Sequence, residues 1–129
     1  ADLTLYFANK AGDKLVGQRV AMEYNSNISL EKLIVEQLIA GPPFEGAYPT
    51  IPSETKLLNI SIKDKICYVN LGTGYNVIES IPVYSIVNSL IENTDAQKVQ
   101  ISINGESNRM FRESINFDTI FEKNEGLIE

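Results

Sequence analysis

The stretch Leu33–Leu58, LIVEQLIAGPPFEGAYPTIPSETKLL, contains the end of a helix and the start of a strand. Its apolar residues recur at helical spacing, and Ser29 is a preferred N-cap, so we expect a helix over residues 30–40. Gly41 can supply the left-handed C-terminal residue, and Pro42 prevents the helix from continuing. The sequence therefore predicts that the chain leaves this helix through a Gly-Pro-Pro turn.

The second half of this stretch carries Phe44, Tyr48 and Ile51 among turn-forming residues. Long connections of this kind are often functional, so a binding loop and a structural connection are both reasonable interpretations. Pro52 precedes the next strand, where proline breaks no ladder hydrogen bond. We expect a helix-to-sheet connection in which the three apolar side chains fold back under the helix end. Residues 44–48 remain a candidate ligand-binding segment.

Outside this stretch the sequence predicts two β-hairpins, a second helix and a last strand. Their ranges are 3–8 and 15–24 for the first hairpin, 56–63 and 66–71 for the second, a helix capped by Ser80 with an apolar stripe from Val83 to Ile91, and 98–104 for the last strand. In the second hairpin Leu58, Ile60 and Ile62 are expected to face inward.

The resulting element order, ββαββαβ, predicts an α+β fold. The strands alternate apolar and polar residues, so one sheet face should be wet. We expect a two-layer sandwich, with a mainly antiparallel sheet of about five strands covered on one face by two helices. No linker or repeat divides the chain, so residues 1–129 should form a single domain. The tail from residue 106 can add an edge strand around 111–117.

Composition excludes several functional classes. The chain has 129 residues, a net charge of -6 and no histidine, which is the usual general base and the commonest metal ligand. An acidic chain without a basic patch is repelled by nucleic acid and by anionic membranes. Gly72-Thr-Gly74 lacks the third glycine of a dinucleotide fingerprint. Cys67, the single cysteine, should be a buried core residue. We therefore predict no cofactor, no metal, no nucleic acid partner and no enzymatic activity.

One predicted sheet face is polar and mildly aromatic. Tyr68 and Asn70 project from their strand on the side opposite Cys67, and Gln100 has the same orientation on the last strand. This face is either an ordinary wet surface or a docking surface. Its expected members are Asn59, Ser61, Tyr68, Asn70, Gln100 and Ser102.

Several segments, in their order and spacing, resemble the GerMN domain of sporulation and spore germination proteins. They are Leu38–Pro42 (LIAGP), Ile51-Pro52, Thr55–Leu58 (TKLL), Val69–Leu71 (VNL), Val87–Leu90 (VNSL) and Val99–Gly105 (VQISING). In this resemblance Gly41, Pro42, Pro52 and Gly105 are structural motif positions. The chain departs from the family pattern at Glu54, Asn70 and Gly72, which bears on partner choice more than on fold.

The resemblance implies a bacterial protein outside the cytoplasm, commonly a lipoprotein whose lipidated cysteine would precede Ala1. It implies a role in sporulation or germination and a likeness to ring-building modules, with no catalytic residues. We expect a non-catalytic interaction or assembly module whose partners are envelope or sporulation proteins or further copies of itself. One alternative is a module that binds cell-wall glycan or a small ligand through Phe44, Tyr48 and Tyr68. Another is a hydrolase with two facing carboxylates.

Overall fold

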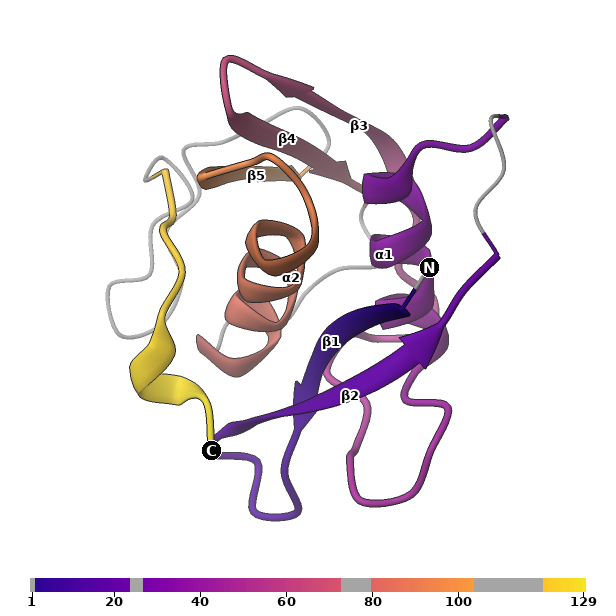
Figure 1. The fold of residues 1–129 in the computed structure, drawn as a ribbon, viewed down its shortest axis with the longest axis vertical. Helices are drawn as coiled ribbons and strands as arrows, with labels where there is room; N and C mark the ends of the chain where they lie inside the picture. Colours follow the sequence, from indigo (N-terminus) through magenta and orange to yellow (C-terminus); the bar gives the residue numbers. More distant parts are fainter. Residues whose placement is uncertain (1, 24–26, 73–79, 104–119) are drawn as a thin grey trace.

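The computed structural model describes residues 2–23, 27–72, 80–103 and 120–129 (Figure 1). Its element order is ββαββαβ, which confirms the predicted α+β class and order. The strands are β1 (Asp2–Ala8), β2 (Leu15–Ala21), β3 (Leu57–Lys63), β4 (Ile66–Leu71) and β5 (Lys98–Ile103); the helices are α1 (Leu30–Ala40) and α2 (Ser80–Asn93), followed by a 3-10 turn, η2 (Glu125–Leu127).

The strands divide between two sheets instead of joining in one. Strands β1 and β2 form an antiparallel pair, and β3, β4 and β5 form a three-stranded sheet in that order. Within the larger sheet β3 and β4 are antiparallel, whereas β4 and β5 are parallel because α2 connects them as a crossover. Helix α2 packs against both β1 and β5, so it lies between the two sheets (Figure 1).

Helix α1 begins and ends where local sequence signals place it. The Ser29 side chain accepts a hydrogen bond from the Lys32 amide, as an N-cap does. Gly41 has φ 103° and ψ 171°, and its amide donates to the Gln37 carbonyl at 3.0 Å. The positive φ was expected, but the extended ψ belongs to a region that is essentially restricted to glycine. Pro42 follows directly, so the helix stops at Ala40.

The core lies around α2, which is buried over most of its circumference. The single apolar stripe expected for this helix is present, but Ser85, Asn88 and Ser89 are also fully buried. A helix between two sheets has little surface left for solvent, so its polar side chains need partners within the protein. The inward side chains of the larger sheet are those predicted: Cys67, Val69 and Leu71 from β4, and Val99, Ile101 and Ile103 from β5.

Leu58 does not point inward, so this part of the prediction is wrong. Its side chain is 50% exposed, while Leu57 packs against the core. The β3–β4 register shifts between Leu57 and Asn59, and such a bulge changes the face to which the flanking side chains point. Ile60 and Ile62, beyond the bulge, face the core as expected.

Candidate interaction surfaces

The larger sheet presents the predicted polar face, here called the outer sheet face: Asn59, Ser61, Tyr68, Asn70, Gln100 and Ser102. The strand registers place these side chains in two cross-strand rows. Tyr68 lies opposite Ser61 on one side and Gln100 on the other, and Asn70 lies between Asn59 and Ser102. The Ser102 hydroxyl donates to Asn70 Oδ1 at 3.2 Å, and Tyr68 is 38% exposed. The structure therefore brings Tyr68, Asn70 and Gln100 together, with Lys63 and Lys98 in the next cross-strand row of the same face.

The cluster expected under the helix end does not form. Phe44 and Tyr48 are 57% and 45% exposed, whereas Ile51 is buried in the main core. The reason is backbone pairing, since the Tyr48 amide and carbonyl form hydrogen bonds with Ala8 of β1 at 2.9 and 3.0 Å. This pairing extends the chain along β1 and leaves the Tyr48 side chain at the surface. Sequence periodicity gives no signal for such an isolated bridge.

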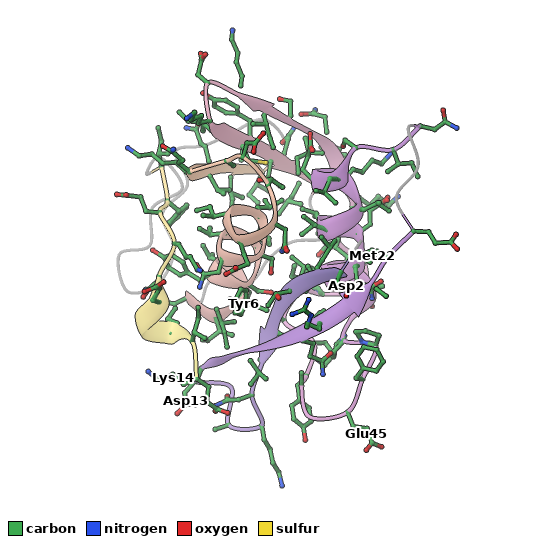
Figure 2. All side chains as sticks on the ribbon, viewed as in Figure 1. Asp2, Tyr6, Asp13, Lys14, Met22 and Glu45 are labelled. Atoms are coloured by element: carbon green, nitrogen blue, oxygen red, sulfur yellow. The ribbon has the colours of Figure 1, made fainter. Side chains whose placement is uncertain are left out.

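Phe44 and Tyr48 do not share a site with Tyr68. The loop that carries Glu45, next to Phe44, lies at one end of the molecule's longest axis (Figure 2). The β3–β4 hairpin lies at the other end of that axis (Figure 1). A single aromatic pocket made from all three residues, which would have favoured the glycan-binding alternative, is therefore excluded by their positions.

Two adjoining depressions run along the C-terminal end of α1. They have volumes of about 530 and 420 Å³ and share Ile39, Ala40 and Ser53 in their walls. Pro52 lines the second, which gives this motif position a place at the surface. The hydroxyl of Thr55 is buried near the first without a hydrogen-bond partner among the described residues. Gly105 and the edge strand expected at 111–117 lie outside the described residues.

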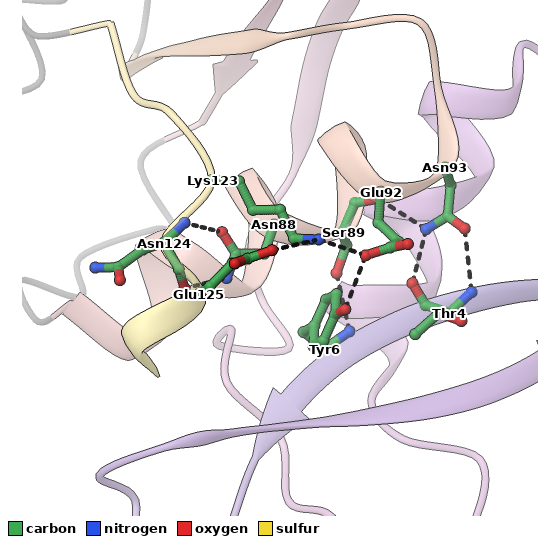
Figure 3. Close-up of polar contacts among 9 residues, drawn as sticks. All are labelled: Thr4, Tyr6, Asn88, Ser89, Glu92, Asn93, Lys123, Asn124 and Glu125. Carbon is green, nitrogen blue, oxygen red and sulfur yellow. Dashed lines mark hydrogen bonds and ion pairs between the residues drawn. The ribbon is translucent and has the colours of Figure 1, made fainter. Parts of the chain in front are cut away.

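Polar side chains of α2 bind the outer edge of β1, a feature that sequence reasoning missed (Figure 3). The Asn93 side chain accepts from the Thr4 amide at 3.1 Å and donates to the Thr4 carbonyl at 2.7 Å. The Ser89 hydroxyl accepts from the Tyr6 amide at 2.9 Å, and the Ser85 hydroxyl donates to the Tyr6 carbonyl at 2.6 Å. These three side chains, here called the α2 polar ladder, satisfy backbone groups that a neighbouring strand would otherwise satisfy.

The C-terminal segment crosses the same helix and is fixed to it by polar contacts. The amide of Asn124 donates to the Asn88 side chain, and Lys123 Nζ lies 2.7 Å from Glu92 Oε1 (Figure 3). The Tyr6 hydroxyl donates to the same Glu92 oxygen. The Lys123 hydrogen bond, followed by that from Tyr6, lowers the pKa of Glu92. Burial, aided by Glu92, raises the pKa of Tyr6 to about 12.

The pKa shifts of Glu92 and Cys67 run opposite to those of a general acid and of a nucleophile. A depression of about 520 Å³ has Glu31, Glu92 and Asp95 in its wall, but a general acid needs a raised carboxyl pKa and Glu92 has a lowered one. Cys67 is fully buried, and burial raises the pKa of its thiol to about 12, so it is a core residue as predicted. Across the four described ranges, no cluster of acidic or cysteine side chains could hold a metal ion. Neither α1 nor α2 is long and apolar enough to span a membrane.

A family model described as Germane, sporulation and spore germination, matches residues 4–109. The chain belongs to this family. The Germane fold is also seen in solved structures. The tandem GerMN domains of the sporulation protein GerM from Bacillus subtilis match with a TM-score of 0.78 and 20% identity, over 99% of this chain and 47% of that one. The chain thus spans about half the length of that tandem structure.

Two further structures share the Germane fold. The first GerMN domain of the same GerM protein matches with a TM-score of 0.73 and 22% identity, over 88% of this chain and 90% of that one. A protein from Clostridium perfringens named "Putative Lipoprotein" matches with a TM-score of 0.62 and 24% identity, over 100% of this chain and 93% of that one. No curated protein sequence matches the chain. The resemblance to the GerMN domain is therefore confirmed.

Proposed function

We propose that this chain is a non-catalytic protein-interaction or assembly module of a bacterial sporulation or germination lipoprotein. In this proposal it acts outside the cytoplasm, held at the membrane by a lipid anchor upstream of Ala1, and its partners are envelope or sporulation proteins or further copies of itself. Membership of a family described by sporulation and spore germination supports the biological setting. The name of the Clostridium perfringens structure supports the lipoprotein part.

The observation that carries the interaction role is the outer sheet face. Its six side chains are uncharged, and the lysines of the same face, Lys63 and Lys98, lie in the next cross-strand row at one end, so a partner could cover the centre of the face without burying unpaired charges. Tyr68, exposed between Ser61 and Gln100, is the type of residue that most often anchors protein interfaces. The amide groups of Asn70 and Gln100 can then fix the orientation of the partner.

The test uses the full-length protein in sporulating cells of its own species. The wild type and the variants Tyr68→Ser, Gln100→Glu and Tyr48→Ser are tagged, crosslinked and recovered. Tyr48 is the matched control, because it is an exposed tyrosine in the loop of Glu45, which lies at the other end of the molecule (Figure 2). We expect a specific partner that is lost with Tyr68→Ser and Gln100→Glu and kept with Tyr48→Ser. Failure to recover a partner, together with normal spores after deletion of the gene, would refute the proposal.

A second candidate function is binding of cell-wall glycan or a small ligand. It is favoured by the exposure of two aromatic side chains, Phe44 and Tyr48, in one loop, since aromatic rings can stack on sugars. The test is sedimentation with purified peptidoglycan. Under this hypothesis binding is lost in Tyr48→Ala and kept in Tyr68→Ala. Equal recovery of all three proteins in the supernatant would exclude it.

A further inference from the structure

Among the described residues, the small sheet has one edge that is occupied and one that is open. On β1, Thr4, Tyr6 and Ala8 direct their amides and carbonyls away from β2. The α2 polar ladder satisfies those of Thr4 and Tyr6, and Tyr48 satisfies those of Ala8. The outer edge of β1 is therefore occupied along most of its length and cannot accept another strand.

The pairing register reveals the state of the opposite edge. In an antiparallel pair, two residues that face each other direct their polar backbone groups either both inward or both outward. Thr4 faces Arg19, and Tyr6 faces Gly17, so Arg19 and Gly17 direct their amides and carbonyls away from β1. Ala21 follows in the same alternation. All three residues are exposed, and no other strand of the described residues pairs with this part of β2.

The beginning of this edge already accepts an extended segment. Ile128 forms a parallel bridge with Leu15, and the Glu129 amide donates to the Leu15 carbonyl at 2.8 Å. The contact occupies only the first outward-facing position of β2. The adjacent positions, Gly17 to Ala21, continue the same row of backbone groups without a bulge or a proline. Such devices normally protect an edge, and β3 has one of them in its bulge.

An exposed aromatic residue belongs to a loop that is bound to the middle of β2. Gln18 Nε2 donates to the carbonyls of Phe44 and Glu45 at 3.1 and 3.2 Å, which fixes their loop beside the middle of β2. The same loop pairs with the outer edge of β1 at Tyr48, so it runs along the face of the small sheet toward which the Gln18 side chain points. An added strand would place alternate side chains on the same face of the sheet as this loop, where the exposed Phe44 offers an apolar contact.

We propose that the open edge of β2, from Gly17 to Ala21, binds an extended peptide segment of a partner protein. The segment adds a third strand to the β1–β2 sheet through backbone hydrogen bonds, and an apolar side chain of it packs on Phe44. A two-stranded sheet gains stability from a third strand, which favours this mode of binding. The site is separate from the outer sheet face, so either surface can fail its test without affecting the other.

The test compares two variants at one position. Arg19→Pro removes the outward amide, while Arg19→Ala keeps it; the native side chain makes only an exposed ion pair with Asp2 at 3.8 Å. A phage-displayed library of random linear peptides of about 12 residues, longer than the strand it must cover, is selected on the wild-type chain. Enriched peptides are synthesised with a fluorescent label and titrated against each variant. Ala21→Pro with Ala21→Ser forms a second pair, and circular dichroism checks that each variant is folded.

We expect selected peptides to have alternating apolar residues and to bind Arg19→Ala with the affinity of the wild type. They should bind Arg19→Pro about tenfold or more weakly, because proline removes one backbone hydrogen bond and prevents close approach of the peptide. Bound peptide should slow hydrogen exchange of the Gly17, Arg19 and Ala21 amides. The substitution Phe44→Ser should weaken peptide binding. Three results would overturn the proposal: no enriched peptide, equal affinity for both Arg19 variants, or a dimer in sedimentation that Arg19→Pro abolishes. The last would make a second copy the occupant.

Discussion

Replacing Asn93 by alanine should destabilise the protein by about 2–3 kcal/mol. The Asn93 side chain makes three hydrogen bonds, two with the backbone of Thr4 and one with the Ser89 carbonyl at 2.7 Å. Each is expected to contribute about 1 kcal/mol, and an amide left without a partner adds to the loss. Thr4 and Asn93 are only half-buried, so water can form hydrogen bonds with the groups that lose their partners. The total loss of stability therefore stays near the sum of the three hydrogen bonds.

The assay is equilibrium unfolding in urea, followed by circular dichroism, together with hydrogen exchange of the Thr4 amide. Asn59→Ala is the matched control, because Asn59 is an exposed asparagine in β3, and it should change the free energy of unfolding by less than about 0.5 kcal/mol. The Thr4 amide should exchange faster in Asn93→Ala beyond what the lower global stability explains. If Asn93→Ala resembles Asn59→Ala, or leaves Thr4 exchange unchanged, the α2 polar ladder does not hold β1.

Three further predictions concern other parts of the fold. Gly41→Ala should lower the free energy of unfolding by about 1–3 kcal/mol, because φ 103° with ψ 171° is strained for a residue with a side chain; an unchanged urea midpoint would contradict this. The native Cys67 thiol should resist maleimide, since its pKa is raised to about 12; rapid labelling without denaturant would contradict its burial. The pKa of Glu92 is lowered below its usual 4.5, so its stabilising contribution is present above that pH and lost as the pH falls through the folded pKa. Lys123→Met should therefore make the acid side of the stability–pH curve shallower; an unchanged curve would show that this ion pair contributes nothing.

The elements were predictable where local physical chemistry decides them. Ser29, Gly41 and Pro42 mark the ends of α1 by capping and by backbone restriction, which act within a few residues. The alternation in β4 and β5 likewise identified the inward side chains, and with them the outer sheet face around Tyr68 and Gln100. Such signals depend on sequence neighbours alone, so a single sequence is enough to read them.

The remaining features depend on contacts between distant segments. Leu58 was placed on the wrong face because a bulge leaves no periodic signal. Tyr48 was expected under the helix end, but an isolated bridge to Ala8 fixes its backbone elsewhere. The same holds for the open edge of β2. It could not be identified until the structure showed which amides of β1 turn away from β2, and no pattern in Gly17 to Ala21 reveals it.

The division of the strands into two sheets has a physical cause in α2. A strand beside β1 would need the amides and carbonyls that the α2 polar ladder already binds, so β1 cannot join the larger sheet while the helix is in place. The members of this ladder, Ser85, Ser89 and Asn93, recur every four residues and so share one face of the helix. That spacing, next to the apolar stripe, was the readable sign that this helix has two buried faces, one apolar and one that binds a strand edge. A consequence is that binding at the small sheet is directed to β2, because α2 has closed the alternative edge.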